Sequence, residues 1–244
     1  TNSAEGKKFT ATFTVDKGLS DYWLPMAGAA SSVTFDNSEN SDSFYYNSDT
    51  MSAIYPSRTS EGLTYTETGI MPMVPTDKQI AKTDAAAISQ PKAEDVPDCV
   101  DKLATAIAGG QSKGGEAAQA LAEKLKESGW FSHGFSGDYP STAGHGNYRI
   151  DQLLAGTAMV GDSEQYASAM ALMARSLGLP SRVVLGFLPK DDEGEISESR
   201  TEEQGTTTIT KFTGNDVTAW VEIKLDSYGW VAFYPTPKET KVPD

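Results

Sequence analysis

The stretch that decides the fold is Gly161-Asp162-Ser163-Glu164-Gln165-Tyr166-Ala167-Ser168-Ala169-Met170, continued by Leu177-Gly178-Leu179-Pro180-Ser181-Arg182-Val183-Val184-Leu185-Gly186-Phe187. Tyr166, Met170, Met173 and Leu177 recur at i, i+4, i+7 and i+11, the spacing of one apolar face of an α-helix. Asp162 can cap the free amides of this helix while Gln165 reaches back in a capping box, and Gly178 ends it. The β-branched residues from Ser181 to Leu188 then predict a strand directly after the helix.

Two motifs nearer the C-terminus accompany this helix and strand. They are Asp216-Val217-Thr218-Ala219-Trp220-Val221-Glu222-Ile223 and Gly229-Trp230-Val231-Ala232-Phe233-Tyr234-Pro235-Thr236-Pro237. Within them, Ala219 to Leu225 and Gly229 to Tyr234 predict two more strands. The acidic insert from Lys190 to Gly205 lies between the first strand and these two, and we expect it to form a solvated loop.

In order and spacing, these three blocks resemble the core of bacterial transglutaminase-like proteins. In that family a Gly-x-Cys-Glu opening leads a helix that ends in Gly-Ile-Pro-x-Arg-Val-Val-x-Gly-Tyr. An Asp-x-His-Ala-Trp-x-Glu-Val strand and a Gly-Trp-x-x-x-Asp-Pro-Thr-Pro ending follow. The resemblance covers roughly residues 95 to 240. It implies an α+β, papain-like core in which a helical lobe packs on an antiparallel sheet.

The departures from the family pattern fall on its catalytic positions. Matched residue by residue, the family's thiol position is Ser163, its imidazole position is Thr218 and its carboxylate position is Tyr234. Such a site needs a thiolate at a helix N-terminus, an imidazole to hold the proton and a carboxylate to orient the imidazole. A serine hydroxyl is a weak nucleophile without a base, and neither a threonine nor a tyrosine supplies the missing groups. The resemblance therefore implies a pseudoenzyme with a degenerate triad, in which we expect no catalytic residue.

The pattern of the region before this core is typical of β structure. Phe9, Ala11, Phe13 and Val15 alternate with three threonines, which predicts a strand with one buried face. Ser31 to Phe35, Phe44 to Tyr46 and Gly62 to Thr68 predict further short strands. We expect a β-rich N-terminal unit over residues 1–75, a proline-containing connector over 76–95 and the transglutaminase-like core over 96–244. The core should begin with helices at residues 96–107 and 116–127.

Several residues are candidates for lining the former catalytic cleft: Ser163, His145, Asp216, Thr218, Trp220 and Tyr234. The resemblance brings the segment after His145 close to the site, so His145 is the one base that we can name for Ser163. Its alternative is an ordinary solvated loop histidine.

Trp220 and three other side chains also have structural interpretations. Trp220 and Trp230 could line a peptide groove or simply pack in the core. Arg182 suits an ion pair with Glu222. Cys99 suits a small apolar role better than that of a displaced nucleophile.

Composition restricts the partners and cofactors. Thirty-four acidic and twenty basic side chains give a formal charge of -14 and a pI near 4.5, which disfavours nucleic acid and anionic lipid as partners. The single cysteine excludes an internal disulfide. One cysteine and two histidines also provide few possible ligands for zinc. The acidic insert lacks the spacing of an EF-hand, so we predict no metal and no cofactor. No apolar run approaches the ~20 residues that span a bilayer.

The leading function hypothesis is a binding or structural module that keeps the shape of the family cleft without its chemistry. Membrane-attached members of the family imply a place outside the cytoplasmic membrane of a bacterium, in a membrane-anchored parent protein, with a peptide, protein or cell-wall component as partner. The chain begins Thr1-Asn2-Ser3, without an initiator Met, and we expect it to be part of a longer protein.

Two alternatives remain. One is a residual acyl-transfer or peptide-hydrolysing enzyme that uses Ser163 with a non-standard base. The other is an architectural spacer whose cleft is filled by its own side chains, such as Tyr234 or Trp220.

Overall fold

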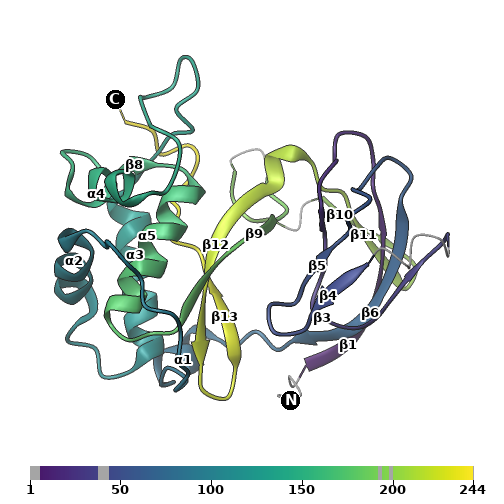
Figure 1. Cartoon of the computed structure of the whole chain (residues 1–244), viewed down its shortest axis with the longest axis horizontal. Helices are drawn as coiled ribbons and strands as arrows, with labels where there is room; N and C mark the ends of the chain where they lie inside the picture. Colours follow the sequence, from purple (N-terminus) through teal and green to yellow (C-terminus); the bar gives the residue numbers. More distant parts are fainter. Residues whose placement is uncertain (1–5, 38–43, 192–193, 198–199, 244) are drawn as a thin grey trace. The chain divides into compact units, whose positions relative to one another are not determined.

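The computed structural model describes residues 6–37, 44–191, 194–197 and 200–243 (Figure 1). The chain divides into two compact units, Thr1–Val74 and Pro75–Asp244. The first contains β1 (Gly6–Thr14), β2 (Trp23–Leu24), β3 (Ala29–Phe35), β4 (Tyr45–Asn47), β5 (Ser52–Ile54) and β6 (Thr64–Pro72). No helix in the described ranges is long and apolar enough to cross a membrane.

The N-terminal unit is built from two antiparallel sheets with the strand orders β1-β6-β3 and β2-β5-β4. The predicted strand at residues 9–15 is confirmed, because β1 pairs along its whole length with β6 and turns Phe9, Ala11 and Phe13 inward. The aromatic rings of Phe13 and Tyr65 stack with centroids 4.9 Å apart, and Tyr65 is fully buried. The predicted strands at 31–35, 44–46 and 62–68 are confirmed as β3, β4 and β6, with small shifts of their ends.

The second unit contains the helices α1 (Asp77–Ala81), α2 (Asp98–Ala108), α3 (Gly114–Ser128), α4 (Asn147–Ala155) and α5 (Ser163–Ser176). Its strands are β7 (Trp130–Phe131), β8 (Val160–Gly161), β9 (Ser181–Phe187), β10 (Thr201–Gln204), β11 (Thr207–Thr210), β12 (Val217–Leu225) and β13 (Gly229–Phe233), with a 3₁₀ turn at Gly214–Asp216. The central sheet is antiparallel with the order β13-β12-β9. This is the α+β arrangement that the sequence predicts.

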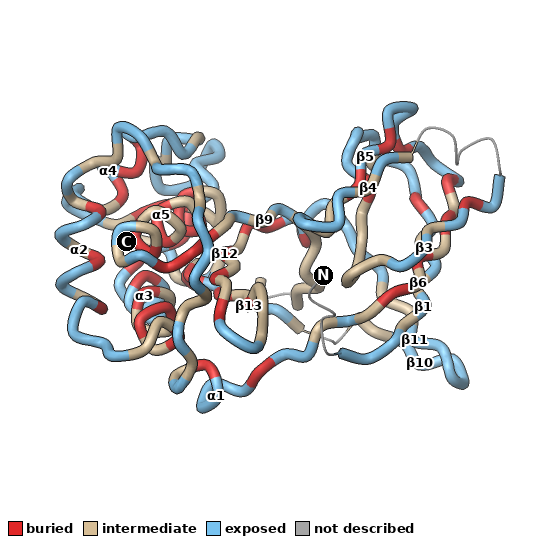
Figure 2. Tube along the Cα trace, turned by 60° about the horizontal axis from the view of Figure 1, so that its bottom comes forward, coloured by how far each residue is buried: buried red, intermediate tan, exposed pale blue. Residues whose placement is uncertain are grey.

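Helix α5 is the middle of the core of this unit. It packs against β12 and β9 and also contacts α2, α3 and α4. Its apolar face is fully buried at Tyr166, Met170 and Met173, as the helical period predicts. The buried positions of α3 and α5 are seen in Figure 2. Gly178, which follows the helix, has a φ of +76°, the left-handed conformation that favours glycine at a helix end.

Residues 76–95, expected as a connector, contain structure of their own. Thr76 and Gln79 form a capping box at the start of α1, and Ile80 is buried in the core of the second unit. Farther along, Ala85 pairs with Leu225 of β12, and the side chain of Gln90 exchanges two hydrogen bonds with the backbone of Ser181. The segment therefore packs on the sheet. Five helical residues are too few to show an amphipathic period.

The acidic insert also differs from the expected loop. Lys190 pairs with Ile196 in an antiparallel bridge, and β10 and β11 form a hairpin across the turn at Gly205. The threonines of β11 are β-branched and favour a strand, and Gly205 takes a positive φ of 66° at the turn. The prediction of a simple solvated loop was wrong. It relied on the net acidity of the segment and did not take account of the β-branched threonines or of the turn glycine, which favour a hairpin.

Candidate functional site

Ser163 is the first residue of α5, and the first turn of this helix is held firmly. The Asp162 carboxylate accepts a hydrogen bond from the backbone N–H of Glu164, and the Gln165 side chain accepts one from Asp162, both at 2.9 Å. Ser163 Oγ in turn accepts a hydrogen bond of 3.1 Å from the backbone N–H of Ala219 in β12. The start of α5 is therefore joined to β12 at the residue after Thr218.

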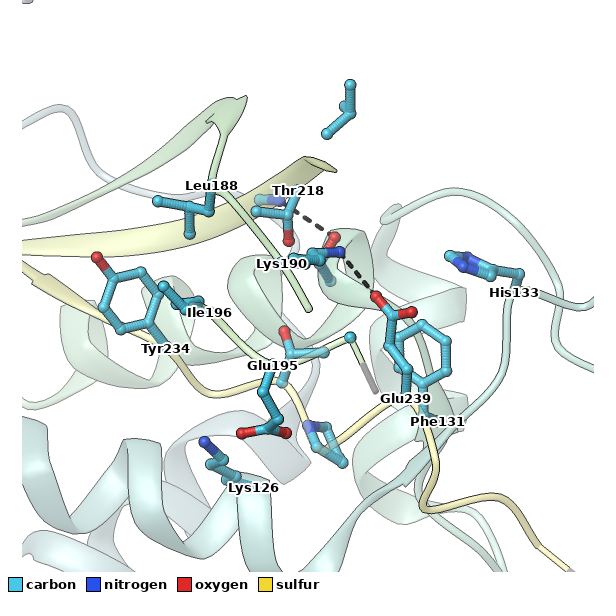
Figure 3. Close-up of a pocket in the computed structure, with 16 residues that line it drawn as sticks. Lys126, Phe131, His133, Leu188, Lys190, Glu195, Ile196, Thr218, Tyr234 and Glu239 are labelled. Carbon is cyan, nitrogen blue, oxygen red and sulfur yellow. Dashed lines mark hydrogen bonds and ion pairs between the residues drawn. The ribbon is translucent and has the colours of Figure 1, made fainter. Parts of the chain in front are cut away.

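The three positions that the motifs match to the family's catalytic residues meet in one pocket of about 70 Å³. Ser163, Thr218 and Tyr234 all line it, the last two from β12 and from the end of β13 (Figure 3). Ligand pockets for small molecules are usually several hundred Å³. This one has room for a single side chain or one end of a ligand.

Neither Thr218 nor Tyr234 supplies the missing acid–base groups. Thr218 is 9% exposed and carries only a hydroxyl. Burial, and then the negative charge of Glu222, raises the pKa of Tyr234 above its ordinary value. The Tyr234 phenol therefore stays neutral at physiological pH and cannot act as a carboxylate.

Of the two histidines, His133 lines the pocket, whereas His145 was the one expected near Ser163. His145 does not appear among the described residues that line the pocket, and its Nδ1 lies 2.7 Å from Glu164 Oε1. This hydrogen bond is the main reason why the pKa of Glu164 is lowered. His133 does line the pocket, and its Nδ1 lies 3.5 Å from Asp162 Oδ2. Within the described ranges, the hydroxyl of Ser163 makes no hydrogen bond to either ring.

Asp216 and Trp220 do not line the pocket as expected, but each has a clear structural place. Asp216 is 1% exposed and accepts hydrogen bonds from Arg200, from Thr213 and from the backbone N–H of Lys190. Burial alone would raise the pKa of Asp216, but these hydrogen bonds outweigh it and lower the pKa. Trp220 packs across Gly186 of β9, where a Cβ atom would lie 2.7 Å from the indole ring.

Two structural expectations outside the pocket are confirmed. Arg182 forms an ion pair with Glu222, 2.6 Å from Nη2 to Oε2, and its guanidinium lies 4.4 Å from the centre of the Trp230 ring. Cys99 in α2 donates a hydrogen bond of 3.3 Å to Asp151. Burial first, and then Asp151, raise the pKa of the Cys99 thiol to about 11, so Cys99 is a poor nucleophile.

The pocket lining also includes residues outside the three sequence motifs, among them Lys126, Phe131, Lys190, Ile196 and Glu239. Lys190 and Glu239 form an ion pair of 2.7 Å in it. They are 49 residues apart, and no motif connects them. Within the described ranges, no three His, Cys, Asp or Glu side chains are placed to hold a metal ion.

Comparison with known proteins agrees with this geometry. The family described as the transglutaminase-like superfamily matches residues 101–235. The uncharacterized protein YebA of Bacillus subtilis is 36% identical over 87 residues, which are 36% of this chain and 11% of the relative. This chain therefore spans only a small part of that protein.

Two crystal structures of the periplasmic domain of TgpA from Pseudomonas aeruginosa share the fold. One is 16% identical with a TM-score of 0.56 and covers 94% of this chain and 70% of the other. The second, bound to ethylmercury, is 15% identical with a TM-score of 0.55 and covers 94% and 72%.

Proposed function

Since the chain belongs to the transglutaminase-like superfamily, we propose that it is a non-catalytic member whose cleft binds a peptide group without reacting with it. The proposal adds two properties to the family assignment. The first is the loss of catalysis, and the second is a retained binding function on the extracytoplasmic side of a bacterial membrane.

The observation that carries the loss of catalysis is the environment of Ser163. Its Oγ accepts a hydrogen bond from a backbone amide, and Thr218 of β12, which has no basic group, lines the same pocket. A serine becomes a useful nucleophile when an adjacent base takes its proton. A hydrogen bond from an amide N–H to Oγ makes the hydroxyl a weaker nucleophile, because it withdraws electron density from the oxygen. A positioned hydroxyl of this kind is suited to binding.

The proposed location is supported by the similarity to the periplasmic domain of TgpA. We propose that the chain is the extracytoplasmic part of a membrane-anchored protein and that its partner is a peptide, a protein or a cell-wall component. The small pocket would hold one group of that partner, and the rest of the partner would lie outside it.

A residual hydrolase or acyl transferase is the second candidate, and His133 is the observation that favours it. His133 lines the same pocket as Ser163 and is 3.5 Å from the Asp162 carboxylate, so an imidazole and an acid lie near the hydroxyl. Catalysis would require the ring of His133 to come within about 3 Å of Ser163 Oγ when a substrate binds.

One assay separates the two candidates. The protein is incubated with a glutamine-containing peptide and a primary amine, and ammonia release, amine incorporation and peptide cleavage are followed. We expect the same absence of turnover in the wild type, in Ser163→Ala and in Ser168→Ala, a control on the same helix away from the pocket. Turnover that disappears in Ser163→Ala and His133→Gln, but persists in Ser168→Ala and His145→Gln, would establish the enzyme instead.

A further inference from the structure

Lys190 follows β9 and directs its ammonium group into the pocket. Its backbone N–H donates to Asp216, and its backbone pairs with Ile196, so the residue is fixed on both sides. The Lys190 side chain is only 14% exposed. A lysine that is so far removed from water needs an anionic partner to keep its charge.

The anion that Lys190 now contacts comes from the same chain. Glu239, in the segment after β13, places Oε1 2.7 Å from Lys190 Nζ. On its other side the carboxyl group of Glu239 meets the backbone of Gly194, where an added Cβ would lie 2.6 Å from Oε2. Gly194 also has a positive φ of 77°. The backbone at Gly194 therefore leaves a space that the Glu239 carboxyl occupies, and it excludes a side chain at residue 194.

The remaining polar groups of the pocket suit the same kind of ligand. Ser163 uses its oxygen to accept from Ala219, so its hydroxyl hydrogen can be donated to an incoming acceptor. The other acidic residue of the pocket, Glu195, lies 3.8 Å from Lys238. If Glu239 leaves, the Lys190 ammonium and the Ser163 hydroxyl remain as donors in the pocket.

We infer that the pocket is a carboxylate-binding site with Lys190 as its cation, and that Glu239 occupies it as an internal competitor of a peptide carboxylate. The inference rests on the proposed binding function and names the ligand group. The carboxylate can be the C-terminus of a peptide or the side chain of an acidic residue, because both present the same two oxygens to Lys190.

The test measures binding of three N-acetylated alanine-rich tripeptides by calorimetry and by shifts of backbone amide signals. One has a free C-terminal carboxylate, one is amidated, and one is amidated with a central glutamate. We expect Glu239→Gln to bind a carboxylate peptide about fivefold more tightly than the wild type, since the competing ion pair is lost. Lys190→Gln should lose the preference for carboxylate over amide. Lys124→Gln, which removes the same charge at an exposed position of α3 outside the pocket lining, should bind like the wild type.

Gly194→Ala provides a second variant that keeps every charge. Introduced into Glu239→Gln, the added methyl group should fill the space that the Glu239 carboxyl occupied and remove the gain in carboxylate binding. Signals of the α5 and β12 amides should shift on binding and confirm that the fold is kept.

The outcomes distinguish the carboxylate site from the proposed function on which it rests. Equal affinity of Glu239→Gln for the acid and amide peptides would overturn the carboxylate inference while peptide binding itself stands. Failure of all three peptides to bind Glu239→Gln would also overturn the carboxylate inference. Turnover by the wild type with the glutamine peptide and amine would overturn the proposed function whatever the affinities are. Preference for the free C-terminus or for the glutamate peptide identifies the source of the carboxylate.

Discussion

Replacement of Tyr166 by phenylalanine tests how α5 is held in place beside the site. Tyr166 is fully buried, and its hydroxyl accepts from the N–H of Trp130 at 3.0 Å while the carbonyl oxygens of Trp130 and Met159 each lie 2.8 Å away. The phenol thus joins α5 to the parallel pair β7 and β8. Gly129 leaves room for it, because a Cβ there would lie 2.3 Å from the hydroxyl oxygen.

The expected loss of stability depends on which hydrogen bonds remain after the Tyr166 hydroxyl is removed. The Trp130 N–H keeps its 2.8 Å bond to the Met159 carbonyl, so this donor still has a partner. The carbonyl oxygens of Trp130 and Met159 lose the Tyr166 hydroxyl, the donor that they share. This loss costs about 1–2 kcal/mol in the free energy of unfolding. For a unit of this size, that corresponds to a fall in Tm of about 2–8 °C.

Thermal unfolding followed by calorimetry measures this loss, with Tyr148→Phe as the matched control. Tyr148 is 76% exposed and its hydroxyl accepts a hydrogen bond from Gln152 in the same helix, so the control should stay within about 0.5 kcal/mol of the wild type. If Tyr166→Phe changes stability no more than Tyr148→Phe does, the assignment of a supporting role to this hydroxyl is wrong.

Two further predictions concern titrating groups. Glu67 in β6 is fully buried, with Oε2 accepting from the N–H of Ala27, and burial raises the pKa of Glu67 above 4.5. Its contribution to stability is complete below the ordinary pKa and is lost as the pH rises through the raised one. Hydrogen exchange of residues 64–72 should therefore accelerate beyond its intrinsic increase as the pH rises from the ordinary pKa of a glutamate to the raised pKa of Glu67. Glu67→Gln should remove this dependence, and the exposed Glu61→Gln should keep it; a persistent dependence in Glu67→Gln would contradict the assignment. For Cys99, a pKa of about 11 leaves about one thiol in a thousand ionised at pH 8, so alkylation should be slow. Asp151→Asn should lower the pKa and accelerate the reaction, and an unchanged rate would show that Asp151 does not hold the thiol.

The sequence could predict the parts of the fold that follow a regular period. Tyr166, Met170 and Met173 identify α5 because the core-facing positions of a long helix repeat every three or four residues. The alternation of Phe9, Ala11 and Phe13 identifies β1 for the same reason with a period of two. Short elements such as α1 and α4 have too few residues to show a period, and their stability comes mainly from the surfaces that they pack against.

The candidate site likewise has residues that sequence motifs locate and residues that they cannot locate. Ser163, Thr218 and Tyr234 are brought together in the structure, and sequence motifs located all three. Lys190 and Glu239 could not be found, because their contact depends on how a turn after β9 folds back toward the segment after β13. The expectation for His145 missed its partner Glu164, since the loop conformation decides which acid an imidazole reaches.

The buried Asp216 has a consequence for how this protein can diversify. Its carboxylate binds both Lys190 and Arg200, so the two ends of the intervening loop are fixed at one point on the scaffold. The entropy cost of closing a loop grows only with the logarithm of its length. Residues can then be added between these two ends at small entropic cost to the rest of the domain. One carboxylate thus lets the loop beside the pocket evolve separately from the helix and sheet that form the pocket's base.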